Sequence, residues 1–381
     1  MNKIYASYNN IISSLGFDSE TVVQNIHDEK SGLELVENKK VLPQPFYSSI
    51  INRENLQANF ELLNIKGSFT HLEHMMISSL SKVIRASNIP LTDRLGLIIS
   101  TTKGNIDVLD QNSKFSKERA YLSTLGQVIK QSLGFKKEAI VVSNACVSGV
   151  LSIAIAKRYI NQGVYDNVFI VSGDIVTEFI ITGFNSFQAL SKEPCKPYDK
   201  NRSGVNIGEV AASILVTKDT NALSKEAVVV LGEGSSNDAN HISGPSRTGE
   251  GLCRSIQSAI KESNIAFGDI DYISAHGTAT LFNDETESVA FNRLELSAVP
   301  LNSLKGYFGH TLGASGLVET IVGMHSLKNN ALYASLGFKE LGVSKPLNII
   351  TKTTPKKLDV FLKTASGFGG CNTAVLFQKV K

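Results

Sequence analysis

The chain has 381 residues, of which 42% are hydrophobic and 19% are charged, and its formal net charge at pH 7 is +3. This length suggests two domains or two closely packed halves, and the composition excludes a disordered or fibrous chain. The small positive charge, without any block of Lys and Arg residues, argues against a nucleic-acid-binding protein.

The N-terminal residues 1–10 lack the apolar segment of a signal peptide, so we expect a protein that is not exported. The chain has four cysteines, at positions far apart: Cys146, Cys195, Cys253 and Cys371. They form no Cys-x-x-Cys pair, so we expect neither a disulfide framework nor a zinc site, and a cytoplasmic location fits best.

Short apolar, β-branched runs alternate with longer helical patterns along the chain. The runs that read as strands are residues 95–99, 139–142, 168–171, 211–216 and 227–231. Strands that alternate with helices predict an α/β sheet architecture. The polar stretch 217–226 separates two such series, so we predict an N-terminal half at 1–222 and a C-terminal half at 223–381.

One uncharged stretch, residues 139–156, is nominally long enough to span a membrane. It contains Ser143, Asn144, Ser148 and Ser152, which favour a buried strand that runs into a buried helix. We therefore expect no membrane association.

The two halves show a weak internal repeat. Residues 146–155 and 313–322 align on their Ser-Gly pairs, and each segment opens a helix of small residues. Each helix is later followed by a strand that ends in Ser-Gly, at 172–173 and at 366–367. Two similar halves would place a functional site between them.

Cys146 is the first candidate for chemistry. It follows the predicted strand and precedes a helical pattern that starts near Val150, so it should lie at a helix N-terminus. The helix dipole and free amides there favour a thiolate and lower the thiol pKa, and the amides can also form half of an oxyanion hole. A free cysteine is, however, commonly only a small buried apolar residue.

Three further segments in the C-terminal half carry polar groups at strand ends or in glycine-rich turns. His276 ends a β-like run and is followed by the hydroxyls of Thr278 and Thr280, as expected for a binding residue in an α/β crevice. Lys305 and His310 lie among small residues in the segment 302–316. The turn 366–372, Ser-Gly-Phe-Gly-Gly-Cys-Asn, could offer a backbone amide.

Together these segments resemble the β-ketoacyl-acyl carrier protein synthases, in the branch with a Cys-His-His triad. The nucleophilic Cys, His-Gly-Thr-x-Thr, Lys-x-x-x-Gly-His and Gly-Phe-Gly-Gly-x-Asn occur in the family's order from about residue 90 to the C-terminus. The resemblance implies a thiolase-like α/β fold, with two pseudo-duplicated α-β-α halves in a five-layered α-β-α-β-α core. It also implies an acyltransferase that joins malonyl-acyl carrier protein to an acyl group by decarboxylative Claisen condensation.

The resemblance also implies a role for individual residues. Cys146 would hold the acyl group as a thioester, while His276 and His310 would promote malonyl decarboxylation. Lys305 would orient these groups through Glu319, and Phe368 would be the gate of the acyl pocket and an oxyanion-hole amide. The hydroxyls expected to contact the phosphopantetheine arm belong to Ser243, Thr278 and Thr280.

No resident cofactor or metal is implied, because the substrates arrive on the phosphopantetheine arm of acyl carrier protein. A homodimer is expected, and a heterodimer with a non-catalytic sister chain is an alternative. The pathway, whether fatty-acid synthesis or a specialised polyene or polyketide route, stays open.

Several positions depart from the family pattern. The first strand is expected to be short, since its usual Thr-Gly-Leu-Gly turn is absent. Gln188 stands where a carrier-docking arginine is expected, and the loop after Thr280 lacks the usual Pro and Gly. Ser366 and Cys371 replace a common aromatic residue and a common Thr near the gate, so the size of the acyl pocket could differ.

Three alternatives fit the same residues less well. A thiolase needs a reactive cysteine before its C-terminal glycines, whereas Cys371 follows Gly369 and Gly370. The Cys-His-Asn branch would have asparagine in place of His310. A subunit that only sets chain length for a partner synthase would normally have lost the nucleophile.

Overall fold

The computed structural model describes residues 3–238 and 246–381. In this part of the chain, eleven strands form one continuous mixed sheet that divides into two five-stranded blocks and one extra edge strand. The first block contains, in spatial order, β5 (Ile140–Val142), β4 (Leu95–Ser100), β6 (Asn167–Asp174), β8 (Val210–Thr217) and β1 (Tyr5–Ser13). The second contains β11 (Pro300–Asn302), β10 (Tyr272–Ser274), β15 (Val360–Ser366), β16 (Cys371–Lys379) and β9 (Val228–Asn237).

The two blocks have the same topology. Numbered along the chain within each block, the strands follow the order 3-2-4-5-1. In both blocks, strands 3, 2 and 4 run parallel to one another. Strand 5 pairs antiparallel with strand 4, and strand 1 pairs antiparallel with strand 5. This shared pattern supports the pseudo-duplication expected from the sequence. The blocks meet where β1 pairs with β9, with Tyr5 opposite Val229 and Ala6 opposite Val228.

The remaining strands are short. The edge strand β13 (Asn348–Ile349) extends the second block beyond β11. One small separate sheet contains β2 (Glu34–Val36), β3 (Phe46–Ser49) and β7 (Ile207–Gly208). Another contains β12 (Ala331–Leu332) and β14 (Thr354–Pro355).

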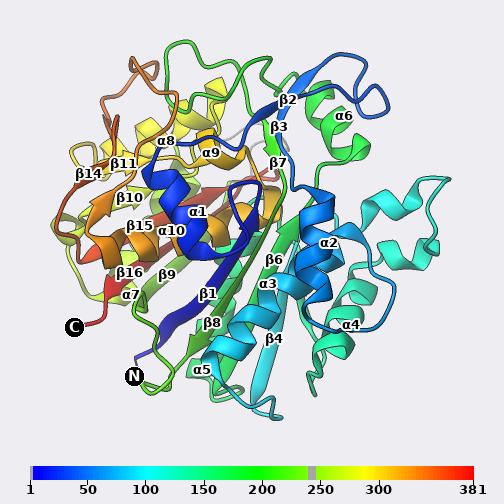
Figure 1. Cartoon of the computed structure of the whole chain (residues 1–381). Helices are drawn as coiled ribbons and strands as arrows, with labels where there is room; N and C mark the ends of the chain where they lie inside the picture. Colours follow the sequence, from blue (N-terminus) through cyan, green and yellow to red (C-terminus); the bar gives the residue numbers. More distant parts are fainter. Residues whose placement is uncertain (1–2, 239–245) are drawn as a thin grey trace.

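The helices complete five layers (Figure 1). Helix α3 (His71–Ser87) covers the outer face of the first block, and α7 (Glu250–Ser263) covers that of the second. Helices α5 (Ser148–Asn161) and α10 (Ser315–Asn329) lie between the blocks and contact strands of both. The other helices are α1 (Ser19–His27), α2 (Arg53–Glu61), α4 (Leu122–Leu133), α6 (Glu178–Ser186), α8 (Leu281–Arg293) and α9 (Lys305–Phe308). Short 3-10 turns are η1 (Ile106–Leu109), η2 (Lys117–Ala120), η3 (Phe267–Asp269) and η4 (Leu312–Ala314).

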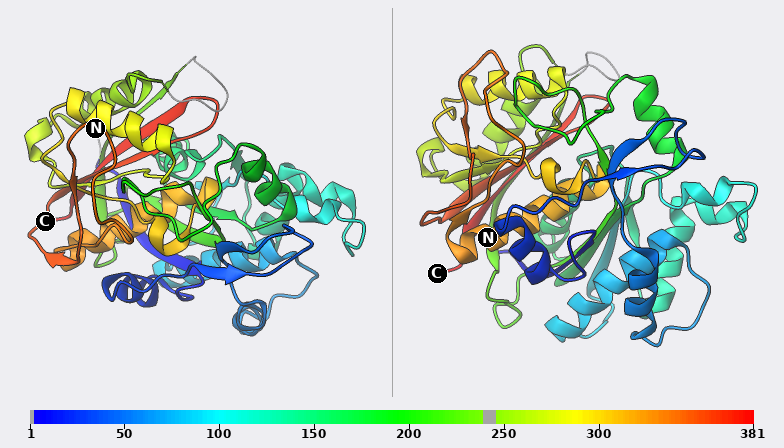
Figure 2. Two further views of the ribbon diagram at one scale, coloured as in Figure 1. Left: turned by 90° about the horizontal axis from the view of Figure 1, so that it is seen from above. Right: turned by 45° about the horizontal axis from the view of Figure 1, so that its top comes forward.

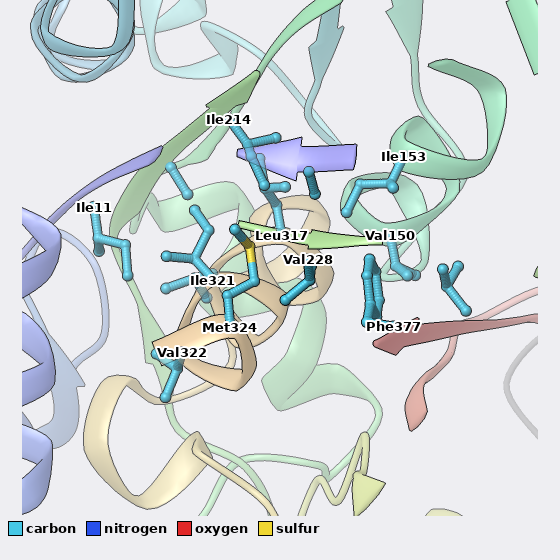
Figure 3. Packing of buried hydrophobic residues seen from close by; sticks show 14 of the residues in the cluster. Ile11, Val150, Ile153, Ile214, Val228, Leu317, Ile321, Val322, Met324 and Phe377 are labelled. Carbon is cyan, nitrogen blue, oxygen red and sulfur yellow. The ribbon is translucent and has the colours of Figure 1, made fainter. Parts of the chain in front are cut away.

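The main core fills the space around α5 and α10. Side chains from α5, α10 and the central strands β1, β8, β9 and β16 pack together there (Figure 3). Helix α10 is buried from Ser315 to Leu327, which explains its apolar and small residues on every side. Because this cluster joins both halves, each half depends on the other for part of its core.

Two glycines allow the starts of α5 and α10 to touch. A Cβ added to Gly149 would lie 2.7 Å from the Leu317 amide nitrogen, and one added to Gly316 would lie 2.6 Å from that of Val150. Contacts this short exclude any side chain. The Ser-Gly pairs that aligned in the sequence are therefore the points where the two helices meet.

Two expectations from the sequence need correction. Strand β1 is not short: it has nine residues and lies inside the sheet. The absence of the usual turn motif does not shorten it, and its buried Ser7 donates a hydrogen bond to the Ala222 carbonyl and accepts one from the Ser224 amide. The run at 139–142 does precede a buried helix, but β5 is a half-buried strand at the sheet edge. None of the helices described is both long and apolar enough to cross a membrane.

Candidate active site

Cys146 lies in a strained turn between β5 and α5. Ala145, the residue before it, has a φ of 43°, a left-handed conformation that is costly for a residue with a side chain. Ser148 holds the turn, because its hydroxyl accepts from the Asn144 amide at 2.8 Å and donates to the Ala145 carbonyl at 2.6 Å. Strained turns of this kind present a nucleophile between a strand and a helix.

The structure brings Cys146 and His310 into direct contact. The Sγ atom of Cys146 lies 3.1 Å from Nε2 of His310. The other ring nitrogen, Nδ1, accepts a hydrogen bond from the Leu312 amide at 3.2 Å. A neutral ring with Nδ1 as acceptor carries its hydrogen on Nε2. The His310 Nε2–H group therefore points at the sulfur.

His276 completes the triad from the end of β10. Its ring centroid lies 5.2 Å from that of His310, and the ligand atoms of the two histidines and Cys146 lie within 4.8 Å of one another. The Lys305 Nζ atom lies 3.4 Å from His276 Nδ1 and 2.5 Å from the His276 carbonyl oxygen. Since an ammonium group only donates, Nδ1 accepts and His276 also carries its hydrogen on Nε2.

Glu319 lies where the sequence motif placed it, beside Lys305. The Lys305 Nζ to Glu319 Oε1 distance is 2.9 Å, and both side chains are almost fully buried. A second lysine, Lys363 of β15, lies 2.6 Å from the other Glu319 oxygen. Lys363 was not predicted from the sequence, although a lysine within the apolar strand 360–366 is a usable signal.

Burial and the nearby lysines set the charge of the triad. Burial, followed by the charge of Lys305, lowers the pKa of His276 and of His310 well below 6.5, so both are neutral near pH 7. Burial raises the pKa of the Cys146 thiol to about 12, although Lys305 and the Phe368 backbone act in the opposite direction. The prediction that the thiol pKa is lowered is therefore wrong. A position at a helix start predicts the direction of the helix dipole, but it does not predict how deeply the thiol is buried.

A buried acidic pair holds the loop that carries His276. Glu287 accepts the His276 amide at 2.9 Å and the Gly277 amide at 2.7 Å, through its two oxygens. Asp284 accepts the Thr278 amide at 2.9 Å and has Arg202 at 3.6 Å. Neither acid was predicted from the sequence to have a role, although their spacing of three residues places them on one face of α8.

Two of the three predicted pantetheine contacts, Thr278 and Thr280, lie between His276 and α8. The hydroxyls of Thr278 and Thr280 are 2.8 Å apart, and Thr278 is buried whereas Thr280 is half-buried. They therefore lead outward from the triad toward the surface. The third predicted contact, Ser243, lies outside the described residues.

The turn 366–372 packs against the segment that carries Cys146: a Cβ added to Gly367 would lie 3.1 Å from the Cys146 amide nitrogen. The Phe368 backbone lowers the pKa of the Cys146 thiol, and the Phe368 ring stacks on Phe184 of α6 with centroids 5.7 Å apart. Phe187, at the end of α6, packs edge-on against the same ring at 5.5 Å. The Phe368 ring remains 39% exposed, so it lies at the boundary between the buried site and solvent.

The face around this turn carries other residues that the sequence singled out. Gln188, in the position expected for a docking arginine, is exposed directly after Phe187. Helices α6 and α8 both lie in the upper part of the molecule in Figure 1, and Figure 2 shows the same face turned forward. Leu281 and Phe282 at the start of α8 are exposed, at 61% and 76%.

Cys146, His276 and His310 are close enough to surround a metal ion, and Cys and His are typical zinc ligands. The surroundings do not fit a dication, because the Lys305 ammonium group touches His276 and a second one belongs to Lys363. A thiol with a pKa of about 12 also holds its proton at neutral pH, and only the thiolate binds metal well. The three residues fit a nucleophile with two hydrogen-bond donors better.

Two family models match the chain: "Beta-ketoacyl synthase, N-terminal domain" at residues 71–222 and "Beta-ketoacyl synthase, C-terminal domain" at residues 227–339. A 3-oxoacyl-[acyl-carrier-protein] synthase 2 of Rhizobium meliloti is 32% identical over 254 residues, which cover 62% of this chain and 60% of the relative. A 3-oxoacyl-[acyl-carrier-protein] synthase 1 of Buchnera aphidicola is 27% identical over 415 aligned residues, which cover 100% of both chains.

Among solved structures, a ketosynthase in complex with its chain length factor, from Xenorhabdus doucetiae, matches with a TM-score of 0.88. The match has 24% identity and covers 100% of this chain and 98% of that one. This likeness confirms the expected thiolase-like α/β fold.

Proposed function

Because the chain belongs to the β-ketoacyl synthase family, we propose that it is a β-ketoacyl-acyl carrier protein synthase with Cys146 as its nucleophile. The observation that carries the proposal is the 3.1 Å contact between the Cys146 sulfur and a neutral His310, with His276 beside them. This arrangement offers one nucleophile and two Nε2–H donors directed at one small space. We assign the chain to the acyltransferases on this ground.

The first half of the reaction loads the enzyme. The Cys146 sulfur attacks the thioester carbonyl of an acyl group on a phosphopantetheine arm, a new S–C bond forms, and the pantetheine thiol leaves with the proton of Cys146. Splitting the transfer through a covalent intermediate replaces one difficult step by two easier ones. Because Leu312 keeps His310 Nδ1 an acceptor, His310 donates to the sulfur instead of taking its proton.

The second half forms the carbon-carbon bond. The malonyl thioester loses its carboxylate as carbon dioxide, and the electron pair moves into an enolate whose oxygen accepts from Nε2–H of His276 and His310. The enolate carbon then attacks the Cys146 thioester, and the amides of Cys146 and Phe368 hold the oxyanion. The C–S bond breaks, so the 3-oxoacyl chain remains on the carrier, and the Cys146 thiolate that leaves takes up a proton from solvent water. Preorganised donors of this kind are worth about a hundred- to a thousandfold each in rate.

Thr278 and Thr280 are positioned to bind the phosphopantetheine arm, and we retain Ser243 as the third contact. The relatives' names place acyl carrier protein as the carrier, and we propose the same for this chain. The exposed Gln188 suggests that docking does not depend on an arginine at that position. No resident cofactor is needed for any step.

We propose that the chain acts as a dimer, with the β5 edge at the interface. Ile140 and Val141 of this edge are only half-buried. Exposed apolar side chains lie at Tyr121, directly before α4, which contacts β5, and at Leu109 and Phe179, on η1 and α6, which contact each other. A second copy of the chain is the expected partner. The alternative is a sister chain that lacks the nucleophile, and the mass of the intact dimer in native mass spectrometry would distinguish the two.

The division near residue 222 stays a prediction, with Cys146 in one half and His276, Lys305 and His310 in the other. A cytoplasmic location also stays a prediction, and the free state of all four cysteines is consistent with a reducing compartment. Fatty-acid and specialised polyene or polyketide pathways both remain open.

The test is a condensation assay with acyl-carrier thioesters of graded length, saturated and unsaturated, and malonyl-acyl carrier protein. The expected result is a 3-oxoacyl thioester longer by two carbons, formed fastest from one range of primers. Formation of no such product from any primer would contradict the proposal. The thiolase alternative would instead condense acetyl thioesters without releasing carbon dioxide.

A further inference from the structure

Lys363 is a buried charge that the mechanism above does not use. It lies in β15 directly opposite Ser274 of the parallel strand β10, two residues before His276. Its side chain is fully buried, with an exposed fraction of 0%. A buried lysine carries a large desolvation cost, so its partners should reveal why it is present.

The contacts of Lys363 indicate a charged ammonium group. Its Nζ atom donates to the carbonyl oxygens of Ser274 at 3.1 Å, Ala275 at 3.3 Å and Thr364 at 2.7 Å. Three carbonyl acceptors use all three hydrogens of an ammonium group, whereas a neutral amine has only two. A charge contact with Glu319 at 2.6 Å, without hydrogen-bond alignment, favours the same charged form.

These contacts connect Lys363 to His276 by two routes. The Ser274 and Ala275 carbonyls belong to the backbone that ends in His276, so Lys363 fixes the position of that strand end. The second route runs through Glu319 to Lys305, whose Nζ lies against His276 Nδ1. Lys363 therefore touches the supports of His276 without touching the ring itself.

The charges around the two histidines are unevenly placed. Lys305 and Lys363 share one carboxylate, that of Glu319, so this three-residue cluster carries one positive charge in excess. The acids Glu287 and Asp284 face the backbone amides of the His276 loop, and Arg202 lies beside Asp284. The charges of Lys305 and Lys363 both lower the pKa of each histidine.

We propose that Lys363 is a positioning residue for malonyl decarboxylation, which keeps His276 a neutral Nε2–H donor and adds a positive charge behind the histidines where the enolate forms. This inference rests on the proposed function. A shared carboxylate between two lysines leaves a net charge of +1, whereas Lys305 and Glu319 alone would cancel. The excess charge opposes protonation of the histidines and favours an anionic transition state.

The test separates the two half-reactions in Lys363→Met, which removes the charge and keeps a similar length. We expect carbon dioxide release from malonyl-acyl carrier protein to fall about ten- to a hundredfold, as for other residues that orient a directly acting group. Acylation of Cys146 should stay within about twofold of wild type, because Lys363 does not contact the sulfur or its turn. The ¹⁵N resonances of the two histidines should titrate at a higher pH in this variant than in wild type.

Charge compensation provides a further measurement. In Lys363→Met/Glu319→Gln, Lys305 alone restores the net charge of +1, so decarboxylation should recover about tenfold relative to Lys363→Met if charge is the cause. The matched control is Lys157→Met, because Lys157 is also a buried lysine but lies remote from the triad. Its Nζ atom lies 3.1 Å from the Leu231 carbonyl oxygen and 2.7 Å from Glu262. This control should keep wild-type rates and histidine titration.

Three results would overturn the inference. One is decarboxylation in Lys363→Met at the wild-type rate, and another is an equal loss of both half-reactions without any change in histidine titration. The third needs no variant: a neutral amine at Lys363 in the ¹⁵N spectrum of the wild-type protein at pH 7. A wild-type protein that neither accepts an acyl group on Cys146 nor decarboxylates a malonyl thioester would instead remove the proposed function, and the inference with it.

Discussion

The connections that follow the third strand of each half supply most of the chemistry, in different ways. Between β5 and α5, residues 143–147 form a short strained turn that presents one reactive atom, the sulfur of Cys146. Between β11 and α10, residues 303–314 form a longer connection that contributes Lys305 and His310. The duplicated fold thus divides the reaction, since one half holds the nucleophile and the other holds hydrogen-bond donors and charge.

The largest expected effect comes from a substitution of Cys146 in the short connection. Cys146→Ala should reduce condensation by at least about a thousandfold, because it removes the sulfur that lies 3.1 Å from His310 Nε2. Cys146→Gln should also fail to condense but should retain malonyl decarboxylation, since its amide resembles the acylated state. Carbon dioxide release and 3-oxoacyl product, measured in parallel, check both variants. Condensation by the alanine variant would show that Cys146 is not the nucleophile.

A substitution of His310 in the longer connection should affect malonyl decarboxylation most. His310→Ala removes an Nε2–H donor from the enolate site, so malonyl decarboxylation should fall about a hundred- to a thousandfold. Acylation of Cys146 should fall less, because the α5 start and the Phe368 amide remain. Mass spectrometry of the Cys146 peptide and release of labelled carbon dioxide give the two rates. A greater loss of acylation than of decarboxylation would mean that His310 acts as a base toward the thiol.

The contact between the two connections can be tested through stability. Gly149→Ala places a methyl group 2.7 Å from the Leu317 amide nitrogen, so the free energy of unfolding should fall by about 1–3 kcal/mol. The matched control is Gly183→Ala in α6, where no atom lies within 4 Å of the new methyl group. That substitution should raise the free energy of unfolding by about 0.4–1 kcal/mol. Urea unfolding measures both values, and equal effects would refute the close approach of α5 and α10.

The smallest effect concerns the resting charge of the nucleophile. With a thiol pKa of about 12, the thiolate fraction of Cys146 rises about tenfold for each pH unit. Alkylation of Cys146 by iodoacetamide, followed by peptide mass spectrometry, should therefore accelerate steadily from pH 7 to pH 9. A rate that levels off near pH 7 would restore the low pKa expected from the sequence.

The sequence located the parts of the site that belong to contiguous motifs. Cys146, His276, Lys305, His310 and Glu319 all lie where the motifs placed them, because each motif is a strand end or turn with local constraints. The resemblance also gave the fold, and the repeat of Ser-Gly pairs marked the contact between α5 and α10.

The rest depended on distances that no local pattern encodes. Lys363 acts on His276 through a neighbouring strand, and Glu287 reaches the same loop from α8. The raised thiol pKa follows from burial and then from Cys371, a residue far from Cys146 in sequence. Strand β1 was expected to be short because a local turn motif is absent, whereas the partners of its buried Ser7 lie more than two hundred residues away.

The most direct test follows the acyl group on Cys146 through one turnover. The protein is loaded with an acyl-acyl carrier protein, the Cys146 adduct is measured by mass spectrometry, and ¹³C-labelled malonyl-acyl carrier protein is then added. The adduct should disappear as labelled carbon dioxide and a 3-oxoacyl thioester with two labelled carbons appear in equal amounts. If the adduct never forms, or if it persists while the malonyl thioester is consumed, the proposal of a condensing enzyme that works through Cys146 is contradicted.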